Sequence, residues 1–262
     1  MLSYLKKAFK RWKTWSALKF LARIQRITHR MPVELKKVTP GRVLLLAPHM
    51  DDEVIGPGGA IILHCRAGSE VAVIFTTDSA GQKTAPGETP IHERRKVEAK
   101  NAADRFGWKV LDFLDFPDGS LTLHENALAE KLAAHLTAWK PDQVFVTFPG
   151  DHHRDHQATS AGLAHALEKL IERKTPWSGM IWCYEVWSPL WPNTDIDITS
   201  VVEEKKDAIA LHASQVKDMG YIESTIGLNR YRGLKVRVPY AEAFFVADAA
   251  DYLKMAQLLN QF

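Results

Sequence analysis

Short apolar runs alternate with amphipathic segments along most of the chain, and this alternation limits the possible folds more than any other feature. Residues 43–47 form an unbroken apolar run, which is typical of a strand buried on both faces. Further β-rich runs predict strands at residues 70–76, 110–114, 143–148, 180–186 and 243–246. Helical patterns separate these runs and predict helices at residues 59–66, 91–106, 124–139 and 156–171, and after the last strand.

Strands that alternate with helices predict an α/β fold, here a Rossmann-like, mostly parallel sheet with helices on both faces. Ser200, with Glu203 three residues later, has the pattern of a capping box and predicts one more helix, which runs to about residue 215. A length of 262 residues fits one such domain. We therefore place the only boundary near residue 38, between an extension at residues 1–38 and a domain at residues 39–262.

Composition excludes several classes of protein. Apolar residues make up 46% of the chain and charged residues 25%, which is typical of a globular protein and not of a disordered one. No apolar run reaches the roughly 18 residues that a membrane-spanning helix needs. Only Cys65 and Cys183 are present, without a CxxC pair, which is typical of a reducing compartment and excludes a cysteine zinc site. We expect a cytoplasmic protein that holds any metal through His and carboxylate side chains.

The first 31 residues differ in charge from the rest of the chain. They hold nine of the 34 Lys and Arg residues and none of the 31 acidic residues, so the remaining chain is net negative although the total charge is +3. Apolar residues recur among these charges at helical spacing, namely Leu2, Leu5, Phe9, Trp12, Phe20, Ile24 and Ile27. The pattern predicts a basic amphipathic helix.

Such a helix has three interpretations. It can lie on an anionic membrane surface, which would make the protein peripheral on the inner membrane surface. It can equally pack on the protein's own body or on a second copy, as in a homo-oligomer. An acid-free start that contains Arg is also typical of a transit peptide. We expect no nucleic-acid partner.

Two polar clusters follow predicted strands directly. His49-Met50-Asp51-Asp52-Glu53 comes after the run at residues 43–48, and Gly150-Asp151-His152-His153-Arg154-Asp155-His156 comes after the run at residues 144–149. In sheets of this kind ligands bind beyond the carboxyl ends of the strands. The two clusters should therefore meet at one edge of the sheet.

The residue types in these clusters predict a metal site. A catalytic zinc is held by three protein nitrogen or oxygen ligands and keeps one open position for water. His49, Asp52 and His156 can supply the three ligands for one zinc ion per chain, which leaves Asp51 to face the water. The alternative is a surface turn of solvated acids or polar helix caps, which would be the better interpretation of either cluster alone.

The motifs in these clusters resemble those of the PIG-L/LmbE-like N-acetylglucosaminyl deacetylases. Residues 47–56 with Gly58 and Gly59 are similar to the family's (A)HPDDE…G-GG motif, and residues 153–156 to its HxDH motif. Shorter matches extend the resemblance from about residue 43 to 245, namely Thr76-Thr77-Asp78, Arg95-Lys96-Val97-Glu98-Ala99, Phe116-Pro117-Asp118-Gly119 and Tyr240-Ala241-Glu242-Ala243-Phe244. Met50 and Arg154 stand where the family usually has proline, which puts the ligand geometry in doubt because proline fixes backbone angles.

The resemblance implies a role for each matching residue. His49, Asp52 and His156 would be the zinc ligands and Asp51 the general base. His153, protonated and held by Asp155, would stabilise the oxyanion or protonate the departing amine; alternatively, Asp155 only caps the following helix. Arg95 and Asp118 would contact substrate, although an Arg on a charged helix is more often solvated.

These inferences predict a zinc-dependent hydrolase that removes an acetyl group from an N-acetylglucosamine-type conjugate, either a small molecule or a lipid-linked amino sugar. Two rival functions remain. Asp151-His152-His153 is also similar to the DHH phosphoesterases, which need two metal ions. A non-catalytic sugar-binding protein or membrane scaffold with the same fold is the other rival.

Overall fold

The computed structural model describes residues 32–81, 84, 87–216 and 220–259. The predicted basic helix at residues 1–31 lies outside the described residues, so it stays a prediction, as does the boundary near residue 38. The compact unit described below spans Leu35–Phe262, apart from the positions just excluded.

The described residues form one mixed sheet of eight strands in the order β1-β7-β8-β6-β5-β2-β3-β4. Five neighbouring strands, from β4 to β6, are parallel, and β8 pairs antiparallel with both β6 and β7. The strands are β1 (Glu34–Lys36), β2 (Arg42–Ala47), β3 (Glu70–Thr77), β4 (Lys109–Phe116), β5 (Gln143–Thr147), β6 (Met180–Tyr184), β7 (Thr194–Asp197) and β8 (Ala241–Asp248). The predicted mostly parallel sheet is confirmed.

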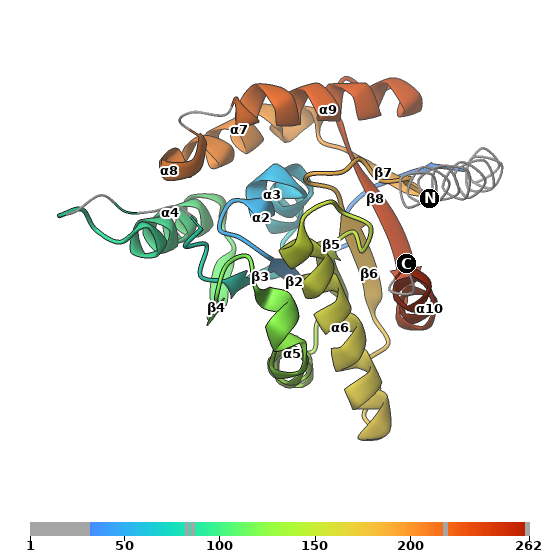
Figure 1. The fold of residues 1–262 in the computed structure, drawn as a ribbon. Helices are drawn as coiled ribbons and strands as arrows, with labels where there is room; N and C mark the ends of the chain where they lie inside the picture. The colour runs from blue at the N-terminus through green and yellow to red at the C-terminus, as the bar shows by residue number, and fades with distance from the viewer. Residues whose placement is uncertain (1–31, 82–83, 85–86, 217–219, 260–262) are drawn as a thin grey trace, which may run out of the picture. The chain divides into compact units, whose positions relative to one another are not determined.

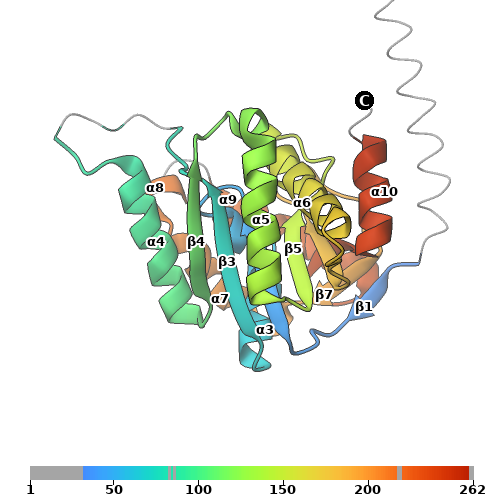
Figure 2. The same ribbon diagram turned by 90° about the horizontal axis from the view of Figure 1, so that it is seen from below.

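Helices cover both faces of this sheet (Figure 1). The α-helices are α2 (Asp52–Ile55), α3 (Gly58–Arg66), α4 (Ile91–Phe106), α5 (Glu125–Trp139), α6 (Arg154–Glu172), α7 (Val202–Ala210), α8 (Ala213–Val216), α9 (Tyr221–Val236) and α10 (Ala249–Leu259), and the 3₁₀ turns are η1 (Leu121–His124) and η2 (Thr199–Val201). Helices α5, α6 and α10 lie together on the face that Figure 2 presents to the viewer. Helices α3, α4 and α7 pack on the opposite face.

The unbroken apolar run of β2 follows from this double cover. Leu44 and Leu46 point into the core beneath α5 and α6, whereas Val43 and Leu45 point into the core beneath α3 and α4. Successive side chains of a strand face opposite sides of a sheet, so a strand that is buried on both sides needs apolar residues at every position.

Three features of the chain differ from the sequence-based prediction. The capping box at Ser200 is wrong, because Ser200 lies within η2 and α7 begins after Val201 without a side-chain cap. The helix also does not continue to residue 215 but ends at Ala210, before the short helix α8. Strands β1 and β7 and helices α2 and α9 were not predicted at all. Helix α9 contains Gly227 and Gly233 and has only a weak apolar stripe, so its sequence lacks a clear helical period.

The strand order positions the two polar clusters. Strand β2 lies between β3 and β5, and the chain leaves β2 toward β3 on one side and returns to β5 on the other. Ligands bind at such a switch point because the loops beyond the two strands diverge and leave a crevice. The cluster at residues 49–53 follows β2 and the cluster at residues 150–156 follows β5, so the fold brings both to this crevice.

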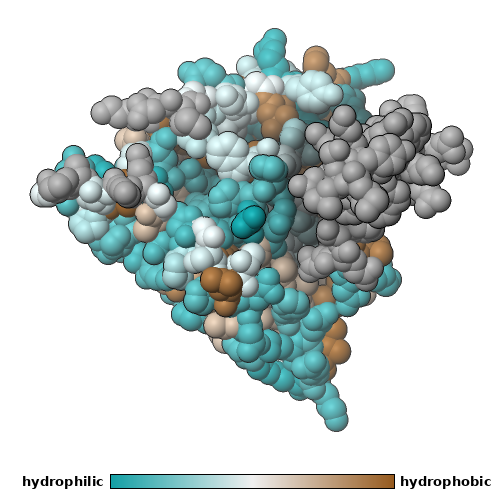
Figure 3. All heavy atoms as spheres, in the orientation of Figure 1, coloured by the Kyte–Doolittle hydropathy of each residue, from teal (hydrophilic) through white to brown (hydrophobic). Residues whose placement is uncertain are grey.

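None of the described helices is long and apolar enough to span a bilayer. The face of the molecule in Figure 3 is mostly hydrophilic, with its apolar residues in small separate patches.

A buried ion pair connects β8 to α7, and its hydrogen bonds reach the start of α3. The side chain of Lys205, on α7, is fully buried, and its Nζ donates to Glu242 Oε1 at 2.6 Å and to the carbonyl of Gly56 at 2.9 Å. The Glu242 carboxylate also accepts the backbone N–H groups of Gly59 at 2.7 Å and Ala60 at 2.8 Å, at the start of α3. Because every partner is buried, this cluster fixes α2 and α3 beside the amino end of β8.

We expect Lys205→Met to lower the free energy of unfolding by about 3–5 kcal/mol, because it leaves the Glu242 carboxylate buried without its cation. Denaturant unfolding measures this loss. Lys206→Met is the matched control, since the neighbouring Lys206 makes only an exposed contact with Glu203 and its replacement should cause no measurable change. Equal stabilities of the two variants would contradict the role of the buried pair.

Candidate functional site

The turn after β2 is closed by the carboxylate of Asp52. Its Oδ2 accepts the backbone N–H of His49 at 2.9 Å and lies 3.2 Å from His49 Nδ1. The N–H groups of Asp51 and Asp52 both point back to the carbonyl of His49, at 3.1 and 3.3 Å. The turn therefore holds the His49 ring and the two carboxylates at the carboxyl end of β2.

Met50 stands where the family motif has proline, and its backbone N–H makes a hydrogen bond that a proline could not make. The N–H donates to Ser79 Oγ, on the loop after β3, at 2.9 Å, and the Met50 carbonyl accepts a hydrogen bond from Gln215 Nε2. Proline has no N–H to donate, so the hydrogen bond to Ser79 takes over the constraint that a proline ring would supply. Arg154 is the first residue of α6, a position whose N–H has no partner within the helix. Both departures from the family motif are thus compatible with the observed backbone.

Asp151 orients His156 in the second cluster. Its Oδ1 accepts the N–H of His153 at 2.9 Å and lies 3.3 Å from His156 Nδ1. Its Oδ2 accepts the N–H groups of Trp187 and Ser188, at 3.0 and 3.1 Å. The ring of His156 is therefore held with Nε2 directed toward the first cluster.

The two clusters meet at Asp52. Its Oδ2 lies 3.2 Å from His156 Nε2, the same distance as from His49 Nδ1. Three ligand atoms around a tetrahedral zinc, with bonds of about 2.0–2.1 Å, are about 3.3 Å apart. Neither ring nitrogen of the fully buried His156 makes a hydrogen bond of good geometry to another described residue, although carboxylate oxygens lie nearby. Close atoms that do not hydrogen-bond are what two ligands of one cation require.

Electrostatics also favours a positive charge between these side chains. Burial lowers the pKa of His156, but the Asp52 carboxylate and the contact with Asp151 raise it more, to about 9. Burial raises the pKa of Asp52, but both imidazoles outweigh it and hold the pKa of that carboxyl well below its usual range. The same carboxylate charges would stabilise a bound cation. The distances from Asp52 to the two histidines therefore match the spacing of ligands of one metal ion, and the local charge favours a cation there.

Two other groups of described residues could hold a metal ion, and both contain His49. They are His49 with His153 and His156, and His49 with Asp118 and Asp155, with candidate ligand atoms within 4.8 Å of one another. Hydrogen bonds already occupy atoms in both groups. His153 Nδ1 accepts a backbone N–H, and both carboxylates accept backbone N–H groups. Asp52 Oδ2 likewise accepts the N–H of His49, so what distinguishes the predicted set is the 3.2 Å distance from this one oxygen to a nitrogen of each ring.

Asp51 lies beside Asp52 and is buried with it. Burial and the neighbouring Asp52 charge raise the pKa of Asp51 to about 7. A carboxylate with a pKa near neutrality can take up and release a proton at physiological pH. The geometry therefore gives the two adjacent aspartates different properties, one fully ionised and one able to exchange a proton.

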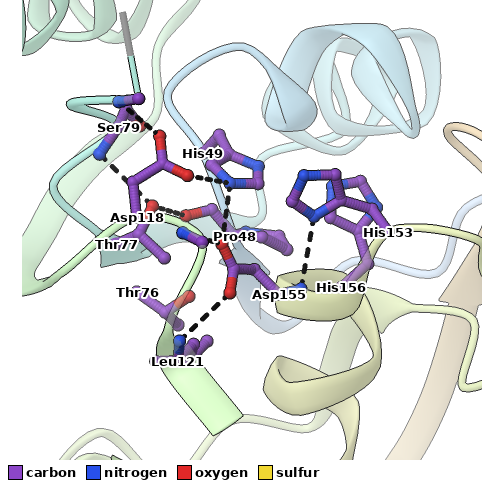
Figure 4. Close-up of polar contacts among 12 residues, drawn as sticks. Pro48, His49, Thr76, Thr77, Ser79, Asp118, Leu121, His153, Asp155 and His156 are labelled. Atoms are coloured by element: carbon purple, nitrogen blue, oxygen red, sulfur yellow. Dashed lines mark hydrogen bonds and ion pairs between the residues drawn. The ribbon is translucent and has the colours of Figure 1, made fainter. Parts of the chain in front are cut away.

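Asp155 does not hold His153 through its carboxylate, which corrects the sequence-based interpretation. Its Oδ2 accepts the N–H of Gly119 at 2.7 Å and lies 3.4 Å from His49 Nε2, and its Oδ1 accepts the N–H of Leu121 at 3.1 Å (Figure 4). The alternative, that Asp155 caps α6, is also not observed. The cap is His153, whose Nδ1 accepts the N–H of Asp155 at 3.2 Å.

These contacts fix the tautomer of His153. Since Nδ1 accepts a hydrogen bond, the neutral ring carries its proton on Nε2. The ring is only partly buried, and its centroid lies 4.8 Å from those of both His49 and His156. Burial and the two neighbouring histidines lower the pKa of His153. His153 thus offers an N–H donor beside the candidate metal ligands.

Asp118 reaches the site from the loop after β4, and Arg95 from the first turns of helix α4. Asp118 Oδ2 accepts the N–H of Gly81 at 2.9 Å, and its Oδ1 lies 3.4 Å from His49 Nε2. Arg95 is buried and not solvated, and its Nη1 donates to the carbonyl of Ser79 at 2.5 Å, beneath the turn that holds Met50. The structure places Asp118 beside His49, and Arg95 holds the loop that carries Ser79. That either residue contacts substrate stays a prediction.

Two residues near the site received no functional role from the sequence. Asp151 stood in the second polar cluster directly after a strand, but only the fold shows that it orients His156. His212, at the start of the segment that leads to α8, is fully buried 2.9 Å from Glu53 Oε1. Its distance along the chain from the first cluster gave no signal of this contact, because only tertiary packing creates it.

Comparison with known proteins shows the family. Residues 44–167 match the profile of the family described as PIG-L: GlcNAc-PI de-N-acetylase. A diacetylchitobiose deacetylase from Thermococcus kodakarensis is 30% identical over 190 residues, which covers 66% of this chain and 70% of that protein. A probable N-acetyl-alpha-D-glucosaminyl L-malate deacetylase 2 from Bacillus cereus is 28% identical over 190 residues, which covers 68% of this chain and 84% of that protein. The chain belongs to the PIG-L family of de-N-acetylases.

Solved structures share the fold. N,N'-diacetylchitobiose deacetylase from Pyrococcus horikoshii has a TM-score of 0.71 at 24% identity, covering 90% of this chain and 94% of that chain. A 4-carboxy-2-hydroxymuconate hydratase from Pseudomonas putida has a TM-score of 0.65, also at 24% identity, covering 79% of this chain and 96% of that chain. Since this fold serves different reactions, the reaction must be inferred from the site.

Proposed function

We propose that the protein is a zinc-dependent hydrolase that removes the acetyl group from an N-acetylglucosamine-type conjugate. The observation that carries the proposal is the position of the Asp52 carboxylate, 3.2 Å from the ring nitrogens of both His49 and His156, with a second buried carboxylate beside it. The family and the names of its relatives support de-N-acetylation of amino sugars as the reaction.

His49, Asp52 and His156 would hold one zinc ion. Bound there, zinc would lower the pKa of a water molecule to about 7 and polarise the acetyl carbonyl. Two carboxylates and a backbone network support the ligands. Asp151 orients His156, and Asp155 faces His49 Nε2 while the backbone of the 119–121 turn holds its other oxygen.

Asp51 is the proposed general base. Its raised pKa suits a group that takes a proton from the attacking water and passes it on. His153 is the proposed hydrogen-bond donor to the oxyanion through its Nε2–H, because its Nδ1 caps α6. Only a protonated His153 could instead give a proton to the departing amine. Asp155 is a proposed positioning residue, which orients His49 and holds the 119–121 turn. Asp118 and Arg95 are the proposed substrate contacts.

Two other functions fit the observations less well. A phosphoesterase of the DHH type needs two metal ions, whereas the compact ligand set suits one. A hydratase shares the fold at low identity but would add water to a carbon–carbon double bond and release no acetate.

The reaction is tested with purified, zinc-loaded protein on N,N'-diacetylchitobiose, N-acetylglucosaminyl malate and N-acetylglucosamine. We expect release of acetate from at least one of them, measured against boiled enzyme. A parallel assay with bis(4-nitrophenyl) phosphate measures phosphodiester cleavage. Absence of acetate from all three sugars, or cleavage of the phosphodiester instead, would overturn the proposal.

Replacing His49, Asp52 or His156 by Ala should lower the metal content well below one ion per chain and abolish turnover. Metal analysis after dialysis measures the content. His152→Ala is the matched control, since His152 is exposed in the same loop and should keep both metal and activity. Full occupancy in all three single variants would refute the proposed ligand set.

Asp51→Asn separates proton transfer from metal binding, because it removes the base while it keeps the size of the side chain. We expect unchanged metal content and a loss of about 10²–10⁴ in kcat. Metal analysis and steady-state kinetics on the same preparation measure both. A wild-type rate would show that Asp51 is not the base.

The sequence-based predictions of a cytoplasmic protein, an inner-membrane surface bound through residues 1–31, a lipid-linked substrate and a homo-oligomer remain predictions.

A further inference from the structure

A cavity of about 170 Å³ lies next to the proposed reaction centre. Its walls come from the carboxyl end of β6, from α9 and from the amino end of β8, and in Figure 1 α9 lies above α2 and the sheet. The lining includes Gly56, Glu185, Trp187, Tyr221, Asn229 and Glu242. No residue of the proposed mechanism is among them.

Two short links connect the cavity to the candidate ligands. The N–H of Trp187 donates to the Asp151 carboxylate that orients His156, and the N–H of Gly56 donates to the carbonyl of Asp52 at 3.0 Å. Ile55, which lines the cavity, donates its N–H to the carbonyl of Asp51 at 2.9 Å. A substrate whose acetyl group reaches Asp51 would therefore extend toward this cavity.

The lining has the chemistry of a sugar site. Trp187, about half exposed, and Tyr221 meet edge to face with ring centroids 6.1 Å apart, so both present aromatic surface at the mouth of the cavity. Asn229 is 4% exposed, and its Oδ1 has no hydrogen-bond partner among the described residues. A buried, unpaired acceptor is costly unless a ligand donates to it, and a sugar hydroxyl is such a donor.

The charges of the cavity distinguish one kind of conjugate from another. Its described lining contains two carboxylates, Glu185 and Glu242, and neither Lys nor Arg. Each carboxylate already has a basic partner behind the wall: Glu185 is bonded by Arg232 at 2.5 Å, and Glu242 by Lys205 at 2.6 Å. A carboxylate or phosphate on the ligand would lose its water there without meeting a free cation in the described lining. An uncharged ring needs no such cation.

We propose that this cavity is the subsite for an uncharged second sugar ring of the conjugate, bound against the aromatic pair of Trp187 and Tyr221 with a hydroxyl donating to Asn229. The proposal rests on the proposed deacetylase function and narrows its substrate class to neutral glycosides of N-acetylglucosamine. A volume of about 170 Å³ is smaller than the roughly 300–1,000 Å³ of pockets that enclose drug-sized ligands, so it suits a single ring.

The test compares three substrates with the full-length, zinc-loaded protein: N,N'-diacetylchitobiose as the neutral disaccharide, N-acetylglucosaminyl malate as the anionic conjugate, and N-acetylglucosamine as the single ring. We expect the highest kcat/KM for the disaccharide. Trp187→Ala should lower kcat/KM for the disaccharide about tenfold, mainly through KM, and change that for the single ring little. The substitution keeps the backbone N–H that Asp151 accepts.

Trp191→Ala is the matched control, because Trp191 is as exposed as Trp187 (47% against 49%) but lies outside the cavity lining, and it should change none of the three values. Ser224→Arg adds a cation to the lining and should raise kcat/KM for the malate conjugate relative to the disaccharide.

The outcomes separate the two proposals. Acetate released from the substrates, but with a preference for the malate conjugate, or with equal effects of Trp187→Ala on one ring and on two, would overturn the subsite and leave the deacetylase function intact. Absence of acetate from every substrate would overturn the deacetylase function and the subsite with it.

Discussion

The site depends on one buried carboxylate that lies between two imidazoles. Asp52 belongs to the turn after β2, and His156 belongs to the helix after β5, about a hundred residues later. Their contact exists because β2 and β5 are parallel neighbours at the point where the strand order reverses, which brings the ends of both strands to one crevice. Removing a carboxylate from water is costly unless cations or hydrogen bonds surround it, so Asp52 and its two histidines stabilise one another only in this arrangement.

The surrounding loops restrict how far that centre can move. The loop after β3 supplies Ser79, which binds the backbone of Met50, and the loop after β4 supplies the backbone N–H groups that hold Asp155. At the other end of the site, the buried pair of Lys205 and Glu242 fixes the start of α3. Side chains held by several partners keep their positions without rearranging during a reaction, which favours electrostatic stabilisation of a transition state.

Local patterns in the sequence predicted much of the fold and part of the site. The apolar run of β2 predicted a strand buried on both faces, and the two polar clusters predicted a common edge. The errors have physical causes. Ser200 matches a capping box, yet a 3₁₀ turn begins before it. Helix α9 lacks a clear apolar period and was missed, because it is stabilised by packing against β8 and α7 more than by its own sequence. Asp155 was assigned to His153, two residues before it in the chain, whereas its carboxylate binds the 119–121 turn across the site.

The sequence by itself determined the α/β class, the family and the residues that form the two clusters, because hydrophobic period and motif spacing are local properties that a chain carries before it folds. Tertiary structure alone decided which atoms meet. The 3.2 Å contact of Asp52 with His156, the bond of Asp151 to the backbone of Trp187, the pairing of Lys205 with Glu242 and the aromatic cavity at Trp187 all join segments far apart in the chain. Such contacts depend on strand order and loop path, which no local pattern encodes.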